Sequence, residues 1–428
     1  MVTEKWRFWQ NALSYTKRAV VKKKFKVAAL GCRTNQYEAE AFRTQLERAG
    51  AQSAQKGEAA DVCIVNTCGV TASAARDSIA RARKLAQENP RAALFVTGCH
   101  AKEVGEAVSE RRILVVPNEK KEELLSELFP KKELAGFAID SFAEHTRAFL
   151  KVQDGCNSFC SYCIIPYVRG RSRSRSLDSI LIELRGLLAR GYREVVLTGI
   201  NIGDFDGGEQ ESLASLLRAA DGLEGLERIR LSSIDPEDVS EELCSALLFC
   251  KKSCPSLHLV LQSGSNVTLK RMHRSYTRQR FLEVVSRLKK GCSDFTFTTD
   301  VIVGFPGETE RDFEESLEVV REVEFAKVHV FPYSPRERTR AALFPDRLPQ
   351  AVVFARKKRL LQEAQERAFS LRERFVGREM EVLLEGKARG RTANFLPVRV
   401  EGRHLKPNQM VPVKLIANDP MSLVGRVA

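Results

Sequence analysis

The chain has 428 residues, of which 43% are hydrophobic, and its formal net charge is +14. This composition excludes a disordered chain, and no apolar run is long enough to cross a membrane. The length allows two or three domains with cores of their own. The positive charge favours a polyanionic partner, with nucleic acid first and an anionic membrane second, although a generally basic surface is the simpler alternative.

The first 25 residues are basic but lack the apolar segment and the small-residue cleavage site of a secretory signal. We expect residues 1–25 to form a basic arm outside the folded domains. Without export, the protein would be cytoplasmic. In that reducing compartment, eleven cysteines indicate metal, cluster or catalytic chemistry more than disulfides.

Residues 26–138 alternate between short apolar strands and amphipathic helices, which is typical of a parallel α/β sheet domain. The expected strands are 26–31, 61–68, 92–99 and 113–117, and the expected helices are 36–50, 73–89 and 120–129.

Cys32 directly follows an expected strand, and Cys68 and Cys99 stand at the ends of two others. Because ligands gather outside the carboxyl ends of parallel strands, these three thiols can converge on one metal or cluster site. Burial as ordinary core cysteines is the alternative. It is the better interpretation for Cys63, which lies inside the second strand.

Residues 142–372 form a second alternating series that ends in a long charged linker helix. Its six β/α steps predict an incomplete (β/α)6 barrel, a fold that places chemistry at the carboxyl ends of its strands. Polar or glycine-rich stretches stand at these ends, and glycine permits close backbone approach to a ligand. The sequence therefore predicts a cofactor-binding site at these strand ends, formed by the stretches TGIN, SSIDP, QSGS, VGFPGE and FPYS.

Cys156, Cys160 and Cys163 form a C-x3-C-x2-C motif after the first strand of this barrel. Thiolates suit iron–sulfur clusters or zinc, and a closed zinc site needs four ligands. Three cysteines can hold a [4Fe–4S] cluster with one open iron, which could chelate S-adenosylmethionine and reductively cleave it to a 5′-deoxyadenosyl radical. A zinc knuckle completed by a distant fourth ligand is the alternative.

From Lys26 onward the chain resembles the radical S-adenosylmethionine methylthiotransferases. The resemblance is carried by GCRTNQYEAE, NTCGVT, GCNSFCSYCIIPYVRG, LTGINIG, LSSIDP, LQSGS, DVIVGFPGE and HVFPYS. CRTNQYE and CNSFCSYCIIPYVRGRSRSR are most similar to the branch that acts on threonylcarbamoyladenosine in bacterial tRNA.

The resemblance implies two [4Fe–4S] clusters and S-adenosylmethionine as cofactors. Cys156, Cys160 and Cys163 would hold the radical-generating cluster, and Cys32, Cys68 and Cys99 an auxiliary cluster that carries the sulfur to be inserted. It assigns no catalytic residue beyond the cluster ligands. The implied S-adenosylmethionine pocket consists of Tyr162, Gly199, Asn201, Ser232, Gln262, Ser263, Asp300, Gly304, Phe331, Tyr333 and Ser334.

The implied reaction adds sulfur and a methyl group to C2 of N6-threonylcarbamoyladenosine next to the anticodon, forming 2-methylthio-N6-threonylcarbamoyladenosine. The implied partners are tRNA, an unidentified sulfur donor and an electron donor such as flavodoxin or ferredoxin. One alternative is the same chemistry on isopentenyladenosine in tRNA or on a ribosomal protein. Another is a non-catalytic iron–sulfur protein that binds RNA or carries electrons.

Arg169, Arg171, Arg173 and Arg175 alternate with small residues directly after the second cysteine group. In an extended segment they would share one face and could contact RNA phosphates or a substrate carboxylate. A solvated charged loop is the alternative.

Residues 375–428 contain short strands between glycine and proline turns, which predict a small β-barrel. This segment resembles the TRAM RNA-binding domain, with a structural lid as the alternative. Its candidate RNA contacts are Arg389, Arg391, Asn394, Phe395 and Arg399.

Overall fold

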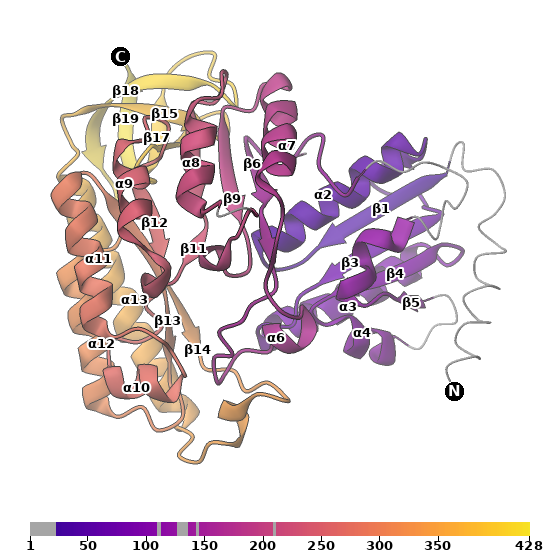
Figure 1. Cartoon of the computed structure of the whole chain (residues 1–428), viewed down its shortest axis with the longest axis horizontal. Helices are drawn as coiled ribbons and strands as arrows, with labels where there is room; N and C mark the ends of the chain where they lie inside the picture. The colour runs from indigo at the N-terminus through magenta and orange to yellow at the C-terminus, as the bar shows by residue number, and fades with distance from the viewer. Residues whose placement is uncertain (1–22, 109–112, 126–135, 143–144, 209–210) are drawn as a thin grey trace. The chain divides into compact units, whose positions relative to one another are not determined.

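The computed structural model describes residues 23–108, 113–125, 136–142, 145–208 and 211–428 (Figure 1). Residues 1–22 of the expected N-terminal arm lie outside the described residues, as do residues 126–129 of the helix expected at 120–129. The chain divides into two compact units. The first unit comprises residues 1–143 and 164–171, and the second comprises residues 144–163 and 172–428.

The first unit contains a parallel sheet in the order β2-β1-β3-β4-β5. Its strands are β1 (Lys24–Ala29), β2 (Gln52–Ser53), β3 (Val62–Thr67), β4 (Ala93–Gly98) and β5 (Ile113–Val115). Its helices are α2 (Arg33–Arg48), α3 (Ala72–Glu88), α4 (Ala101–Ala107), the 3-10 helix η1 (Asn118–Glu123) and α6 (Ile165–Val168).

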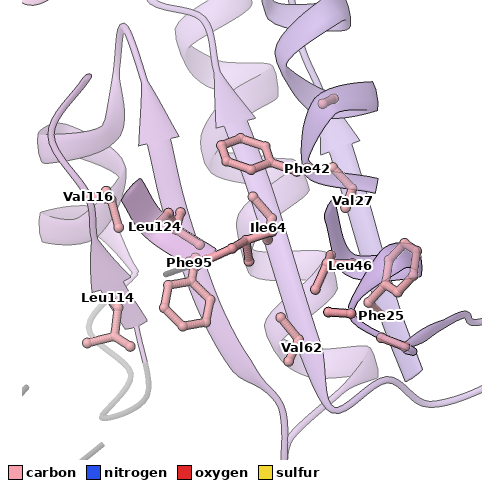
Figure 2. Packing of buried hydrophobic residues seen from close by; sticks show 14 residues of the cluster. Phe25, Val27, Phe42, Leu46, Val62, Ile64, Phe95, Leu114, Val116 and Leu124 are labelled. Carbon is pink, nitrogen blue, oxygen red and sulfur yellow. The ribbon is translucent and has the colours of Figure 1, made fainter. Parts of the chain in front are cut away.

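Strand β3 is buried along its whole length because both faces of the sheet are covered. Val62 and Ile64 point into one core with Phe42 of α2, which Figure 2 shows from close by. Cys63 and Val65 point into the opposite core with Leu85 of α3. Cys63 is fully buried there, as expected for a structural thiol. The continuous apolar pattern of the strand therefore reflects packing on both sides.

The second unit begins with parallel strands in two sheets, β10-β9-β6 and β11-β12-β13-β14. The strands are β6 (Arg147–Lys151), β9 (Glu194–Thr198), β10 (Arg228–Leu231), β11 (Ser233–Ile234), β12 (Ser256–Leu259), β13 (Thr296–Val303) and β14 (Lys327–Pro332). The third expected strand is interrupted at Ser232, so it appears as β10 and β11. The strands otherwise follow one another in chain order, as an open barrel requires.

Helices follow these strands. They are α7 (Leu177–Ala189), α8 (Leu213–Asp221), α9 (Glu241–Phe249), α10 (Asn266–Arg271), α11 (Arg278–Gly291), α12 (Glu310–Val323) and the linker helix α13 (Gln350–Glu373). Side-chain caps fix several of their starts: Thr309 accepts from the backbone of Asp312, whose own side chain closes a capping box. A two-stranded antiparallel ribbon, β7 (Gln153–Asp154) with β8 (Arg173–Ser174), flanks the cysteine loop.

The C-terminal strands form a closed barrel in the order β15-β16-β17-β19-β18. They are β15 (Glu379–Leu384), β16 (Arg389–Thr392), β17 (Pro397–Glu401), β18 (Met410–Asn418) and β19 (Leu423–Val427). Strand β19 was not expected from the sequence, and its parallel pairing with β17 closes the barrel. The expected architecture is confirmed: a parallel α/β sheet, an incomplete β/α barrel and a small closed β-barrel.

Among the helices of the described residues, none is both long enough and apolar enough to traverse a lipid bilayer.

Candidate cluster and cofactor sites

The first cysteine group lies at one edge of the sheet in the first unit. Cys32 follows β1, Cys68 follows β3 and Cys99 follows β4, three strands that are neighbours in the sheet. Cys68 and Cys99 are buried and Cys32 is exposed. Gly31 lies so close that a Cβ atom there would stand 2.5 Å from Cys68 Sγ, and its φ is +86°. Because the two cysteine-bearing loops pack this closely and the φ angle is positive, only glycine fits this position.

Cys99 receives a hydrogen bond from a buried arginine. Arg169 Nε donates to Cys99 Sγ over 3.2 Å, and Arg169 is 1% exposed. Burial raises the pKa of the Cys99 thiol to about 11, while Arg169 acts in the opposite direction. The charges of Cys32 and Cys68 raise this pKa further. An N–H donor to sulfur is typical of the surroundings of cluster ligands.

The second cysteine group occupies the loop after β7 in the second unit. Gly155 and Phe159 have positive φ angles of 75° and 47°, which curl this loop. All three cysteines are partly exposed. Burial raises the pKa of the Cys156 thiol, and two hydrogen bonds with Ser158 partly offset this effect. The Ser158 backbone N–H donates to Cys156 Sγ, and the thiol donates to Ser158 Oγ, both over 3.4 Å. Partial exposure leaves these thiols accessible to an incoming cluster.

An arginine also donates to this second group. Arg274 Nη1 donates to Cys160 Sγ over 3.1 Å, and its Nη2 donates to Asp235. Sequence reasoning missed both residues as functional candidates, although Asp235 belongs to the LSSIDP stretch. Nearby Asp238 has a pKa raised to about 7 by burial and by the charges of Asp235 and Asp204. This acidic group and Arg274 therefore set the electrostatics beside the cysteine loop.

Tyr162, expected to lie against the adenine, belongs to an apolar cluster in the second unit. Its ring meets Phe305 edge-on at 6.3 Å between centroids, and Phe305 contacts Tyr333 at 5.3 Å. Met272 and Ala341 complete the buried centre of this cluster. Burial raises the pKa of Tyr162, which therefore stays protonated. An aromatic wall of this kind suits the flat base of a nucleoside.

The other expected cofactor residues stand at the ends of successive strands. Gly199 and Asn201 follow β9, and Gln262 and Ser263 follow β12. Gln153 Oε1 accepts hydrogen bonds from the backbone of Ile200 and Asn201, which fixes the first of these loops. The remaining residues of the expected set, Ser232, Asp300, Gly304, Phe331, Tyr333 and Ser334, lie between β10 and β11, within β13 and β14, or just after them.

Three of these side chains have polar atoms that suit a polar ligand. Ser232 Oγ, Gln262 Oε1 and Tyr333 Oη are buried and have no hydrogen-bond partner within the described residues. Such atoms normally find a partner, and a bound cofactor would supply one. Ser263 differs, because it is fully buried and its hydroxyl accepts from the backbone of Ser265. The Ser263 hydroxyl therefore stabilises the backbone of the loop that follows β12.

Both cysteine groups fit iron–sulfur clusters by the chemistry of their donors. Each group offers three sulfurs, and an arginine N–H reaches one sulfur of each. A cluster takes each thiolate on a different iron, so its ligands need not surround one ion. Over the described ranges, no three His, Cys, Asp or Glu side chains are arranged as ligands of a single metal ion.

The arginine run does not form one face, and this expectation is wrong. Arg169 is buried beside Cys99 and follows α6, so it is not available to RNA in this structure. Arg175 is half-buried and donates to Glu183 over 2.6 Å. Arg171 and Arg173 are exposed, and Arg173 also pairs with Asp154. The run folds into a helix end and a short strand, which sends its side chains in different directions.

Part of the expected RNA surface of the β-barrel is also corrected. Asn394 is 1% exposed and donates to the backbone of Asp294. The Phe395 ring is covered by the guanidinium groups of Arg391 at 4.4 Å, Arg230 at 5.1 Å and Arg147 at 5.6 Å. These residues hold the barrel against the β/α strands, so they do not form an open stacking surface.

Arg389 and Arg399 of the barrel are exposed, as a phosphate contact requires.

Comparisons with known proteins agree with this architecture. The model of the Radical SAM superfamily matches residues 150–320, and that of Uncharacterized protein family UPF0004 matches residues 24–116. The chain is similar to the solved radical S-adenosylmethionine methyltransferase TsrM from Kitasatospora setae, with a TM-score of 0.55 and 15% identity. That alignment covers 72% of this chain and 73% of TsrM, and at this identity it shows the fold alone.

Two curated relatives align over most of their length. "Threonylcarbamoyladenosine tRNA methylthiotransferase MtaB" from Chlamydia pneumoniae is 48% identical over 88% of this chain and 90% of the relative. "tRNA-2-methylthio-N(6)-dimethylallyladenosine synthase" from Clostridium novyi is 34% identical over 95% of this chain and 97% of the relative. With two triple-cysteine groups at strand ends and this similarity over nearly the whole length, the chain belongs to the family of radical S-adenosylmethionine tRNA methylthiotransferases.

Proposed function

We propose that this enzyme converts N6-threonylcarbamoyladenosine next to the anticodon of tRNA into its 2-methylthio derivative. The observation that supports this choice of substrate is the 48% identity to the relative named for threonylcarbamoyladenosine. The relatives named for dimethylallyladenosine, the isopentenyladenosine alternative, reach 33–35%.

Enzymes of this family use S-adenosylmethionine and two [4Fe–4S] clusters, which supply a 5′-deoxyadenosyl radical and the sulfur for insertion when they are bound. We assign the radical-generating cluster to Cys156, Cys160 and Cys163. The auxiliary cluster is assigned to the group formed by Cys32, Cys68 and Cys99.

The protein itself binds and shields the S-adenosylmethionine. Ser232, Gln262 and Tyr333 offer buried polar atoms to it, and the cluster around Tyr162 and Phe305 offers an apolar wall. Such a wall keeps water away from a reactive intermediate, while the polar atoms fix its orientation.

The tRNA contacts of this proposal are the exposed arginines. Arg171, Arg173, Arg389 and Arg399 can bind phosphates, and an arginine is also the natural partner of the carboxylate in threonylcarbamoyladenosine. Dimethylallyladenosine has no carboxylate, so such a contact would separate the two substrates. A flavodoxin or ferredoxin is the proposed electron donor, and the cytoplasm, where tRNA is modified, is the proposed location.

The test is nucleoside mass spectrometry of total tRNA from cells with and without the gene. Loss of 2-methylthio-N6-threonylcarbamoyladenosine alone supports the proposal, and loss of the dimethylallyl analogue overturns the substrate. An unchanged tRNA pool overturns the substrate class. Incubation of the reduced protein with S-adenosylmethionine then separates the remaining alternatives: 5′-deoxyadenosine points to a ribosomal-protein substrate, and none points to a non-catalytic iron–sulfur protein.

A further inference from the structure

A network of fully buried polar side chains surrounds Cys99 in the first unit. The side chains of Arg169, Glu38 and Lys121 are each 0% exposed. Arg169 stands six positions after Cys163, in the stretch that the sequence assigns to RNA contact, yet it packs among residues of the N-terminal sheet domain. Because arginine is rarely buried without specific partners, the groups that Arg169 contacts indicate what it does.

Each arm of the Arg169 guanidinium has a partner. Nε donates to Cys99 Sγ over 3.2 Å, and Nη1 donates to Glu38 Oε1 over 3.0 Å. Nη2 donates to Asn35 Oδ1 in a short contact. Because arginine stays protonated in proteins, this geometry fixes a permanent positive charge against the sulfur of Cys99.

Asn35 extends the network to the other two cysteines. Its Nδ2 donates to the backbone carbonyls of Leu30 over 2.7 Å and Thr67 over 3.0 Å. Leu30 lies two residues before Cys32, and Thr67 directly precedes Cys68. One amide therefore holds the chain at both of these loops.

The backbone N–H of Cys99 donates to the carbonyl of Thr67 over 3.0 Å, which joins the third loop to the second.

Glu38 anchors the network on its far side. Its Oε1 also accepts from Lys121 Nζ over 2.6 Å, and its Oε2 accepts from Asn66 Nδ2 over 2.8 Å. Asn66 lies in β3, two residues before Cys68. The carboxylate thus fixes Arg169 relative to the sheet.

We propose that Arg169 is a positioning residue of the auxiliary cluster, which it serves through its N–H donation to Cys99 Sγ and its bonds to Asn35 and Glu38. This inference rests on the proposed assignment of that cluster to Cys32, Cys68 and Cys99. A hydrogen bond and a positive charge at a ligand sulfur stabilise the more negative, reduced cluster. Arg169 therefore raises the reduction potential of the auxiliary cluster and holds its three loops in register.

The test uses the full chain carrying Cys156→Ala, Cys160→Ala and Cys163→Ala, so that iron bound to it reports the auxiliary site alone. Anaerobically reconstituted protein is analysed for iron content and for its midpoint potential by EPR-monitored redox titration. Arg169→Gln is expected to shift the potential to a more negative value and to speed iron loss to a chelator. If the parent protein binds no iron, the assignment of the cluster itself fails, and this inference fails with it.

Lys121→Met is the matched control, because it removes an equally buried cation that is bonded to the same carboxylate, Glu38. The proposal expects a smaller shift in potential from Lys121→Met than from Arg169→Gln. Equal shifts, or an unchanged potential in iron-loaded Arg169→Gln, would overturn it.

Arg169→Lys keeps the charge but cannot form the three-armed contact, so it covers the case in which Arg169→Gln does not fold. We expect Arg169→Lys to retain iron and to have a potential below that of the parent. A potential equal to the parent's in this variant would also overturn the proposal.

Discussion

Replacement of Phe395 by alanine separates a structural role of the β-barrel loop from a role in RNA stacking. The Phe395 ring lies under three guanidinium groups, at 4.4, 5.1 and 5.6 Å from its centroid. Three such contacts stabilise the fold by about 2 kcal/mol. Lost packing of this half-buried ring adds about 1 kcal/mol. We therefore expect Phe395→Ala to lower the free energy of unfolding by about 3 kcal/mol.

The assay is urea unfolding followed by circular dichroism, together with tRNA binding over a range of salt concentrations. Arg399→Ala is the control, because its side chain is 47% exposed and its loss should change stability by less than about 0.5 kcal/mol. If Arg399 contacts a phosphate, the same variant reduces the salt dependence of binding by about one ion. A Phe395→Ala protein of unchanged stability but weaker tRNA binding would refute the structural role.

Gly31→Ala is expected to abolish iron binding by the first cysteine group, because its Cβ would stand 2.5 Å from Cys68 Sγ. Gly57 is the control, because it has a similar φ of +85° but no atom within 4 Å of an added Cβ. Gly57→Ala should therefore destabilise the protein by about 1–2 kcal/mol through backbone strain and leave its iron content unchanged. Equal iron loss in both variants would contradict this reasoning. Cys63→Ala should keep all iron and lose about 1 kcal/mol of stability, as measured by iron analysis and thermal unfolding. The raised pKa of Asp238, about 7, means that the folded protein retains a proton that the unfolded chain releases, so its contribution to stability falls as pH rises between about 4 and 7. Asp238→Asn should therefore reduce the loss of stability between about pH 5 and about pH 8, and an unchanged difference in unfolding temperature would show that Asp238 is ionised throughout.

The sequence determined most of the strands and helices and the location of both cysteine groups. Strand β3 spans Val62–Thr67, within the expected 61–68, because a run of apolar residues buried on both faces is visible locally. The expected position of Cys32, Cys68 and Cys99 at the ends of their strands is confirmed, because parallel strands end on one edge regardless of loop detail. The family resemblance was confirmed by relatives that align over most of the chain.

Tertiary structure decided which charged and aromatic residues are buried. Arg169 and Glu38 are 131 positions apart, and nothing in the alternating arginines indicates that one of them meets a carboxylate in the N-terminal domain. Phe395 resembles a stacking residue by sequence, but it faces Arg230, which lies in a strand 165 positions earlier. Strand β19 likewise became recognisable only through its pairing with β17 and β18. Local pattern fixes which elements form, whereas the burial of a charge depends on partners that only the folded chain brings within hydrogen-bonding distance.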